Sequence, residues 1–264
     1  MNTLQLFDSH AHLQDERLQK DIAAVIERAQ GADVAKIVCC GTEEKDWNAV
    51  ADLARKYASV IPCFGVHPWF VNTISEHWGE KLVEYLNKIP SAIGECGLDF
   101  AIHECNREVQ EQVFKQQVLI AKKMSLPISM HCRKAWERFI DILKRIGTLP
   151  GAGLIHSYSG SHDLIPLFEN MGLYISFSGT VTNQRSVNVH TSVKTVSNER
   201  LLVETDSPDL LPYTIEAREK CLYNEPAYLA HVVRSVAHHR EASAEEISSI
   251  TCNNAMRLFS GRAQ

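Results

Sequence analysis

The sequence predicts an α/β protein with the architecture of a (β/α)8 TIM-like barrel, followed by extra C-terminal helices. Three observations lead to this prediction. Short apolar runs alternate with helical patterns along the whole chain, eight such runs can be recognised, and several are apolar at every position. Strands that are buried on both faces have this continuous apolar character, which is typical of a parallel sheet. Eight alternating units favour a closed barrel, with a doubly wound open sheet as the alternative.

The expected strands are separated by segments with helical periodicity. They are Leu4–Phe7, Lys36–Cys40, Val60–Val66, Ala92–Gly94, Ile128–Met130, Gly153–Ile155, Leu173–Ser176 and Leu201–Val203. Apolar residues spaced three and four apart predict helices between them, as in stretches 22–29, 113–121 and 139–143. Two more helices, Tyr228–His239 and Ala244–Phe259, are expected after the last strand.

The chain is expected to form one domain over residues 1–264, because barrels of about 250 residues are common as single units. An apolar content of 45% is enough for one large core. No stretch approaches the roughly 20 apolar residues of a membrane span, and the N-terminus is too short and too polar for a signal peptide. A cytoplasmic protein with no membrane partner and no obligate protein partner is therefore expected.

Charge and cysteine usage narrow the function further. The chain has 27 Lys and Arg against 32 Asp and Glu, a net charge of −5. Proteins that hold nucleic acid through many phosphate contacts usually carry a basic face, so bound cations would have to supply much of the attraction for a polyanion. The eight cysteines contain no CxxC pair and are expected to be buried thiols in a reducing compartment.

Side chains that can bind metal follow five of the expected strands. His10 and His12 form a His-x-His pair after the first strand, and residues two apart point to the same side of an extended chain. Such a pair alone also arises by accident, as capping or surface histidines. The same placement recurs at four later strand ends, at Glu95, His131, His156 and Asp206. The carboxyl ends of barrel strands lie on one face, where active sites are found, and accident poorly explains six such residues.

Four imidazoles and two carboxylates suit borderline or moderately hard divalent ions. Zn2+ and Mn2+ fit best, and Mg2+ is an alternative where carboxylates and water dominate. Six ligands are too many for one tetrahedral ion with an open position, and they suit two ions about 3.5–4 Å apart. Glu95 is the expected bridge between these ions, because its strand lies between the two sets of histidines.

Several neighbouring residues have two interpretations. His67 is expected either to touch a substrate phosphate or to be hydrogen-bonded inside a turn, and Arg133 either to pair with a phosphate or to form a salt bridge with a loop acid. Asp99 and Glu204 are interpreted as groups that orient metal ligands, with ordinary ion pairs as the alternative. Trp69, next to Phe70, is expected to stack a base or to pack at the rim. For Cys96 and Cys132, packing is favoured over metal binding. His238 and His239 are expected on a solvated helix face. The remaining histidines suggest no site; they are His77, His103, His162, His190 and His231.

The ordered motifs resemble the TatD family of metal-dependent deoxyribonucleases, within the amidohydrolase-like barrels. The matching motifs run across almost the whole chain and are Asp8-Ser9-His10-Ala11-His12, Gly65-Val66-His67-Pro68, Gly94-Glu95-Cys96-Gly97-Leu98-Asp99, His131-Cys132-Arg133, His156-Ser157-Tyr158-Ser159-Gly160, Glu204-Thr205-Asp206-Ser207-Pro208 and Asn224-Glu225-Pro226.

The resemblance implies a role for each ligand. One metal would be held by His10, His12, Glu95 and Asp206, and the second by Glu95, His131 and His156. Asp206 would also orient or deprotonate the attacking water, which makes Asp206 and Glu95 the expected catalytic residues. Gln14 departs from the family, which usually has Asp or Asn at this position, and the departure is expected to affect only local packing.

The expected function is hydrolysis of phosphodiester bonds in DNA, with a single strand or an end entering the site as in an exonuclease. An alternative keeps the metals but changes the substrate to an ester or amide, including the ester on the end of tRNA, because loops rather than ligands set specificity. A non-catalytic metal-binding protein is a third interpretation, but it would require the loss of a ligand, and none is missing.

Overall fold

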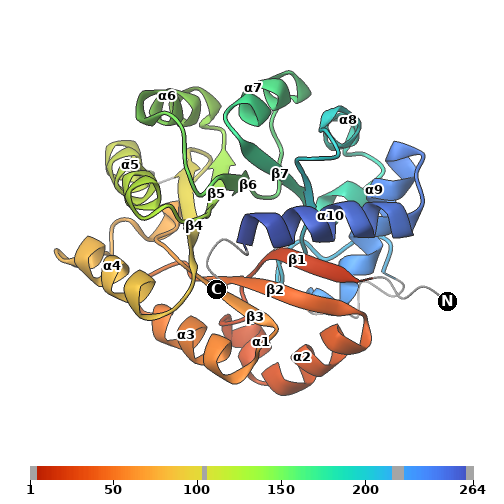
Figure 1. The fold of residues 1–264 in the computed structure, drawn as a ribbon, viewed down its shortest axis with the longest axis horizontal. Helices are drawn as coiled ribbons and strands as arrows, with labels where there is room; N and C mark the ends of the chain where they lie inside the picture. The colour runs from red at the N-terminus through yellow and green to blue at the C-terminus, as the bar shows by residue number, and fades with distance from the viewer. Residues whose placement is uncertain (1–4, 103–105, 216–222, 260–264) are drawn as a thin grey trace.

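The structure, a computed structural model, describes residues 5–102, 106–215 and 223–259. Eight parallel strands follow one another in chain order, and each pairs with the next, while helices surround them (Figure 1). This is the expected (β/α)8 barrel. The strands are β1 Leu6–Ala11, β2 Val34–Cys40, β3 Val60–Phe64, β4 Ala92–Asp99, β5 Ile128–Arg133, β6 Gly153–Ile155, β7 Leu173–Phe177 and β8 Leu201–Val203.

Helices connect successive strands, and two more follow β8. They are α1 Glu16–Gln19, α2 Ile22–Gly31, α3 Trp47–Lys56, α4 Trp78–Lys88, α5 Arg107–Met124, α6 Trp136–Ile146, α7 Ile165–Asn170, α8 Val187–Thr195, α9 Leu229–Arg240 and α10 Ala244–Phe259, with short 3-10 turns η1 Pro68–Phe70, η2 His162–Leu164, η3 Gly179–Thr182 and η5 Pro226–Tyr228. The bounds expected for α10 are confirmed. Helix α9 begins and ends one residue later than expected, because Tyr228 belongs to η5.

Three strands continue at least three residues past their expected ends. β1 reaches Ala11, β4 reaches Asp99 and β5 reaches Arg133, so three of the predicted ligands lie within strands and not after them. Polar side chains were expected to end each strand, but the ladder between β4 and β5 continues through the pair Gly97–His131. Smaller corrections apply elsewhere: β1 starts at Leu6, with Leu4 outside the described residues, β2 starts at Val34, β3 ends at Phe64 and β7 ends at Phe177.

Apolar side chains fill the amino end of the barrel. A buried cluster joins Phe7, Leu154 and Leu202 from the strands to Ala255 and Leu258 from α10. Figure 1 shows α10 lying across this end of the strands, where Phe7 and Phe259 stack with their ring centroids 5.9 Å apart. The larger core lies between the strands and the surrounding helices. Polar groups are therefore left to the carboxyl ends of the strands.

Backbone hydrogen bonds join the last strand segment to the first. The Asp206 N–H donates to the His10 carbonyl at 3.0 Å, and the His12 N–H donates to the Ser207 carbonyl at 2.7 Å. Beside them, the backbone N–H and the hydroxyl of Thr205 both donate to the Asp8 carboxylate. The closure of the barrel thus places the His-x-His pair directly against the segment that carries Asp206.

Two further expectations can be compared with the structure. Six cysteines are described, and all are buried and free of disulfides: Cys39, Cys40, Cys63, Cys96, Cys132 and Cys252. Cys105 and Cys221 lie outside the described residues, as does His103. Within the described part of the chain, no helix has both the length and the apolar character to cross a membrane.

Candidate metal centre

Glu95 lies at the centre of a cluster of imidazoles at the carboxyl end of the barrel. Its Oε2 atom is 3.2 Å from the Nε2 atoms of both His10 and His12. Its Oε1 atom is 2.8 Å from His156 Nε2 and 3.1 Å from His131 Nδ1. The two oxygens of one carboxylate therefore face two different histidine pairs.

Asp206 completes the group around the first pair. Its Oδ1 atom is 3.4 Å from His12 Nε2 and 3.7 Å from His10 Nε2. The Asp206 side chain is 13% exposed, whereas that of Glu95 is 3% exposed. All six predicted ligands thus come together, with Asp206 as the carboxylate nearer to solvent.

The first histidine pair is oriented by the ring nitrogens that face away from Glu95. His12 Nδ1 lies 2.8 Å from the Cys40 carbonyl oxygen, which can only accept, so this nitrogen carries a proton and Nε2 offers a lone pair. His10 Nδ1 lies 2.9 Å from Ser129 Oγ. These partners fix the orientation of each ring, as groups behind metal ligands commonly do.

Two buried carboxylates orient the second pair. Glu204 Oε1 lies 3.3 Å from His156 Nδ1, and Asp99 Oδ2 lies 3.4 Å from His131 Nε2. Carboxylates accept and do not donate, so Glu204 and Asp99 hold a proton on the ring nitrogen that faces them and leave the nitrogen that faces Glu95 as the candidate metal ligand. The geometry matches the orienting role expected for Asp99 and Glu204.

This donor set fits divalent cations. Bare imidazole nitrogens that point at carboxylate oxygens about 3 Å away repel them unless a cation lies between. The Nε2 atoms of His10 and His12 are 3.3 Å apart, and the facing nitrogens of His131 and His156 are 3.1 Å apart. Nitrogens about 2.0–2.1 Å from one tetrahedral ion lie about 3.4 Å from each other. Both pairs therefore have the spacing of ligands that share an ion.

The charges gathered in this cluster shift the pKa values of its members. Burial alone would lower the pKa of His12, but its contacts with Asp206 and Glu95 raise that pKa well above the ordinary value. Burial would raise the pKa of Glu95, yet the surrounding histidines, His156 foremost, hold it well below its usual range. Metal binding at such a site displaces protons from the histidines.

His67 also contacts the cluster. Its Nε2 atom lies 3.3 Å from Glu95 Oε1, and its Nδ1 accepts from the Trp69 N–H at 3.2 Å. Burial lowers the pKa of His67 to about 4, so the ring is neutral at pH 7 and its proton sits on Nε2. Although His67, Glu95 and His131 are close enough to share an ion, this tautomer makes His67 a donor and not a ligand. The sequence indicated that His67 forms a hydrogen bond inside a turn, but it did not indicate the contact with Glu95. The position of His67 after the third strand could have suggested that contact.

The rim of the site carries an aromatic and a cationic side chain. Trp69 is 53% exposed, and its indole N–H donates to Asp99 Oδ2 at 2.8 Å. The Arg133 side chain is 57% exposed, with its guanidinium 3.9 Å from the same oxygen. Both expected interpretations of Arg133 are compatible with this loose pairing, because the remaining donors of the guanidinium face solvent.

Several contributors were missed by sequence reasoning. Cys40 and Ser129 contact His10, and no local pattern marks them because they lie on other strands. Gln14 donates to the Cys40 carbonyl at 2.7 Å, the oxygen that also orients His12. The substitution at this position therefore affects the support of a predicted ligand as well as loop packing. Cys96 donates to the Ser129 carbonyl and not to the cluster, which agrees with a packing role.

Comparison with known proteins gives a consistent result. A family model described as TatD related DNase matches residues 7–260. The chain is 35% identical to YabD of Bacillus subtilis, described as an uncharacterized metal-dependent hydrolase, over 96% of this chain and 98% of that protein. It is 34% identical to the 3′-5′ ssDNA/RNA exonuclease TatD of a Rahnella species, again over 96% and 98%. The crystal structure of the TatD homologue YJJV from Escherichia coli superposes with a TM-score of 0.91 at 29% identity, covering 98% of this chain and 99% of that one.

Proposed function

The chain belongs to the family of TatD-related DNases, which includes metal-dependent hydrolases, and from this premise we propose that it is a two-metal exonuclease acting on single-stranded DNA. The observation that carries the proposal is the division of the Glu95 carboxylate between two histidine pairs. A carboxylate that gives one oxygen to each of two ligand sets is suited to bridge two ions.

The proposed ligands follow this division. His10, His12, Glu95 and Asp206 would hold one divalent ion, and Glu95, His131 and His156 the other. Mixed nitrogen and oxygen donors favour Zn2+ or Mn2+, with Mg2+ as the third candidate. When bound, two such ions supply Lewis acidity that makes a water nucleophilic at neutral pH and neutralises charge on the phosphoryl oxygens.

Asp206 is proposed to orient the attacking water and to accept its proton. Burial would raise the pKa of Asp206, but the hydrogen bond from His12 and the nearby histidines lower it. The carboxylate is therefore ionised at neutral pH and can take a proton. Its partial exposure supports this role, because water can reach it more readily than the buried Glu95.

His67, Arg133 and Trp69 are proposed to hold the strand. The Nε2–H of His67 can donate to a phosphate oxygen in place of Glu95, and the exposed Arg133 can pair with a second phosphate. The exposed Trp69 ring, anchored through Asp99, offers a stacking surface for a base at the mouth.

A free end is the proposed point of attack. A net charge of −5 does not favour the binding of a long duplex through many phosphate contacts. A single strand that enters a site floored by cations needs fewer such contacts. The relative from Rahnella is named a 3′-5′ ssDNA/RNA exonuclease, and the same polarity is proposed here.

The test is cleavage of end-labelled single-stranded DNA, duplex DNA and single-stranded RNA by metal-stripped protein, with Mg2+, Mn2+ or Zn2+ restored separately. The wild type should shorten single strands from the 3′ end only with metal. Glu95→Ala should lose activity and both ions, which metal analysis measures directly. Asp206→Asn should keep its fold and lose at least about 100-fold in turnover, the usual contribution of a general base.

Asp209→Asn is the matched control, because it makes the same substitution in the same loop at a side chain that pairs with Arg17. Activity in Glu95→Ala would contradict the proposal, as would a single bound ion in the wild type. Two bound ions with hydrolysis of small esters but of no strand would instead support the esterase alternative.

A further inference from the structure

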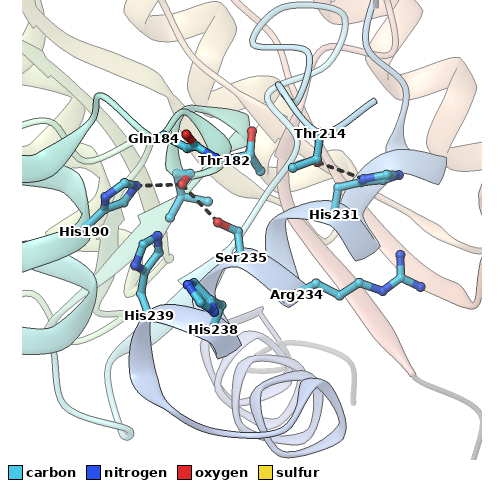
Figure 2. A pocket seen from close by; sticks show the side chains of 10 residues that line it. Thr182, Gln184, His190, Thr214, His231, Arg234, Ser235, His238 and His239 are labelled. Carbon is cyan, nitrogen blue, oxygen red and sulfur yellow. Dashed lines mark hydrogen bonds between the residues drawn. The ribbon is translucent and has the colours of Figure 1, made fainter. Parts of the chain in front are cut away.

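A second pocket, which we call the histidine pocket, lies between η3, α8 and α9 (Figure 2). It has a volume of about 500 Å3, within the range of small-molecule sites. Four histidines, His190, His231, His238 and His239, line it together with Arg234. The sequence suggested no site for any of them, because His190 is far in the chain from the three histidines of α9.

The lining of the histidine pocket is rich in hydrogen-bond donors. None of the described residues that line it is an aspartate or a glutamate, although the chain as a whole is acidic. The Arg234 side chain lies at the edge of the pocket (Figure 2) and, among the described residues, no ion pair occupies it. A cavity whose described lining offers a guanidinium and no carboxylate favours an anion over a cation.

Two of the histidines are held close together. The rings of His190 and His239 stack with their centroids 3.7 Å apart, and His190 Nε2 donates to the Val181 carbonyl at 3.0 Å. Burial, with the charges of His190 and His238, lowers the pKa of His239 to about 4. In the described part of the chain, the groups of three candidate ligand atoms close enough for a metal all lie in the Glu95 cluster and none in this pocket.

We propose that the histidine pocket binds a nucleotide phosphate of the strand that is being degraded. Arg234 would supply the charged fork from the side of His231, and His238 and His239 would donate hydrogen bonds from the opposite side (Figure 2). The volume of the pocket accommodates one nucleotide. This choice of ligand rests on the proposed exonuclease function.

The pocket is connected to the metal centre through two loops. Thr182 follows β7, and its hydroxyl oxygen accepts from the Tyr213 N–H at 2.7 Å. Tyr213 and the pocket residue Thr214 belong to the segment after β8, which also carries Asp206. Both segments leave the carboxyl ends of their strands, the end at which the metal centre lies. In the proposal, a strand bound at the metals extends along these loops and places a distal phosphate in the pocket.

Binding is tested directly, without reference to cleavage. Imidazole NMR signals of the full-length, Zn2+-loaded chain are assigned with His190→Gln and His239→Gln and followed during titration with thymidine 5′-monophosphate, inorganic phosphate and thymidine. Saturable shifts of the His190 and His239 signals are expected with the two phosphates but not with thymidine. Arg234→Gln should weaken this binding about tenfold, the loss expected for one charge-assisted hydrogen bond. His77→Gln, an exposed histidine ion-paired with Glu80, is the matched control and should bind like the wild type.

Kinetics then identify the source of the phosphate. If the strand supplies it, Arg234→Gln should raise KM about tenfold for a strand of about ten nucleotides and much less for a dinucleotide. Pocket signals that stay still with every ligand would overturn the proposal. If free nucleotide binds but Arg234→Gln raises KM equally for the long strand and the dinucleotide, the proposal that the strand supplies the phosphate is overturned. If the wild type binds nucleotide in the pocket but cleaves no strand with any ion, the exonuclease proposal fails while the anion site stands.

Discussion

Glu204 allows a quantitative test of how the metal centre is built. Its side chain is fully buried, its Oε1 lies 3.3 Å from His156 Nδ1, and the same oxygen accepts from the Ser157 N–H at 2.7 Å. Glu204→Gln keeps the size of the side chain and an acceptor oxygen but removes the negative charge. A hydrogen bond to a charged group contributes about 1.5–3 kcal/mol and a neutral one about 1 kcal/mol. The substitution should therefore weaken the support of His156 by about 0.5–2 kcal/mol.

That difference corresponds to a loss of about 2- to 30-fold in affinity for the ion proposed at His131 and His156, since about 1.4 kcal/mol is a factor of ten. The ion at His10 and His12 should be affected much less, because its ligands are oriented by other groups. Stepwise titration of metal-stripped protein with Zn2+ against a chromophoric chelator measures both affinities.

Glu44→Gln is the matched control, because its carboxylate bonds Ser75 and Lys81 and none of the proposed ligands. Equal losses at both sites in Glu204→Gln would refute the reasoning, since they would show that Glu204 supports the whole barrel end and not one ligand. Unchanged affinities would refute it as well.

Four more outcomes are expected. Trp69→Ala should weaken the binding of single-stranded DNA by about 1–3 kcal/mol, the contribution of one stacked base, and raise KM accordingly. Trp69→Phe should retain most of the affinity. Steady-state kinetics with both variants would separate stacking from rim packing. Gly97→Ala should lower the free energy of unfolding in urea by about 3 kcal/mol, because Gly97 has a φ of +149° and a Cβ there would lie 1.9 Å from the His131 carbonyl oxygen. NMR titration should place the pKa of His239 below 6.5, and His190→Gln should raise it by removing a neighbouring positive charge; an unchanged value would exclude that coupling. Stripping the metal should lower the thermal midpoint by about 5–10 °C relative to protein with metal at about 100 times Kd, as calorimetry would show, because such binding stabilises by about 2.7 kcal/mol.

The architecture and the six candidate ligands were accessible from local patterns. Apolar runs such as Gly153–Ile155 and Leu201–Val203 were predicted with their observed bounds, because strands buried on both faces have little freedom in composition. The strands that carry ligands were less well predicted. β1 and β4 were expected to end before His10 and Glu95, but both continue, since the polar side chains find partners inside the end of the barrel.

The sequence by itself thus determined the barrel and the set of side chains that meet at its carboxyl end, because parallel strands bring their carboxyl ends to one face wherever they lie in the chain. Only the tertiary structure decided which nitrogen of each imidazole is free, since that depends on distant partners such as the Cys40 carbonyl, Asp99 and Glu204. The histidine pocket also exists only in the folded chain, because the packing of α8 against α9 brings His190 onto His239. The two residues are too far apart in the sequence for a local pattern to predict their contact.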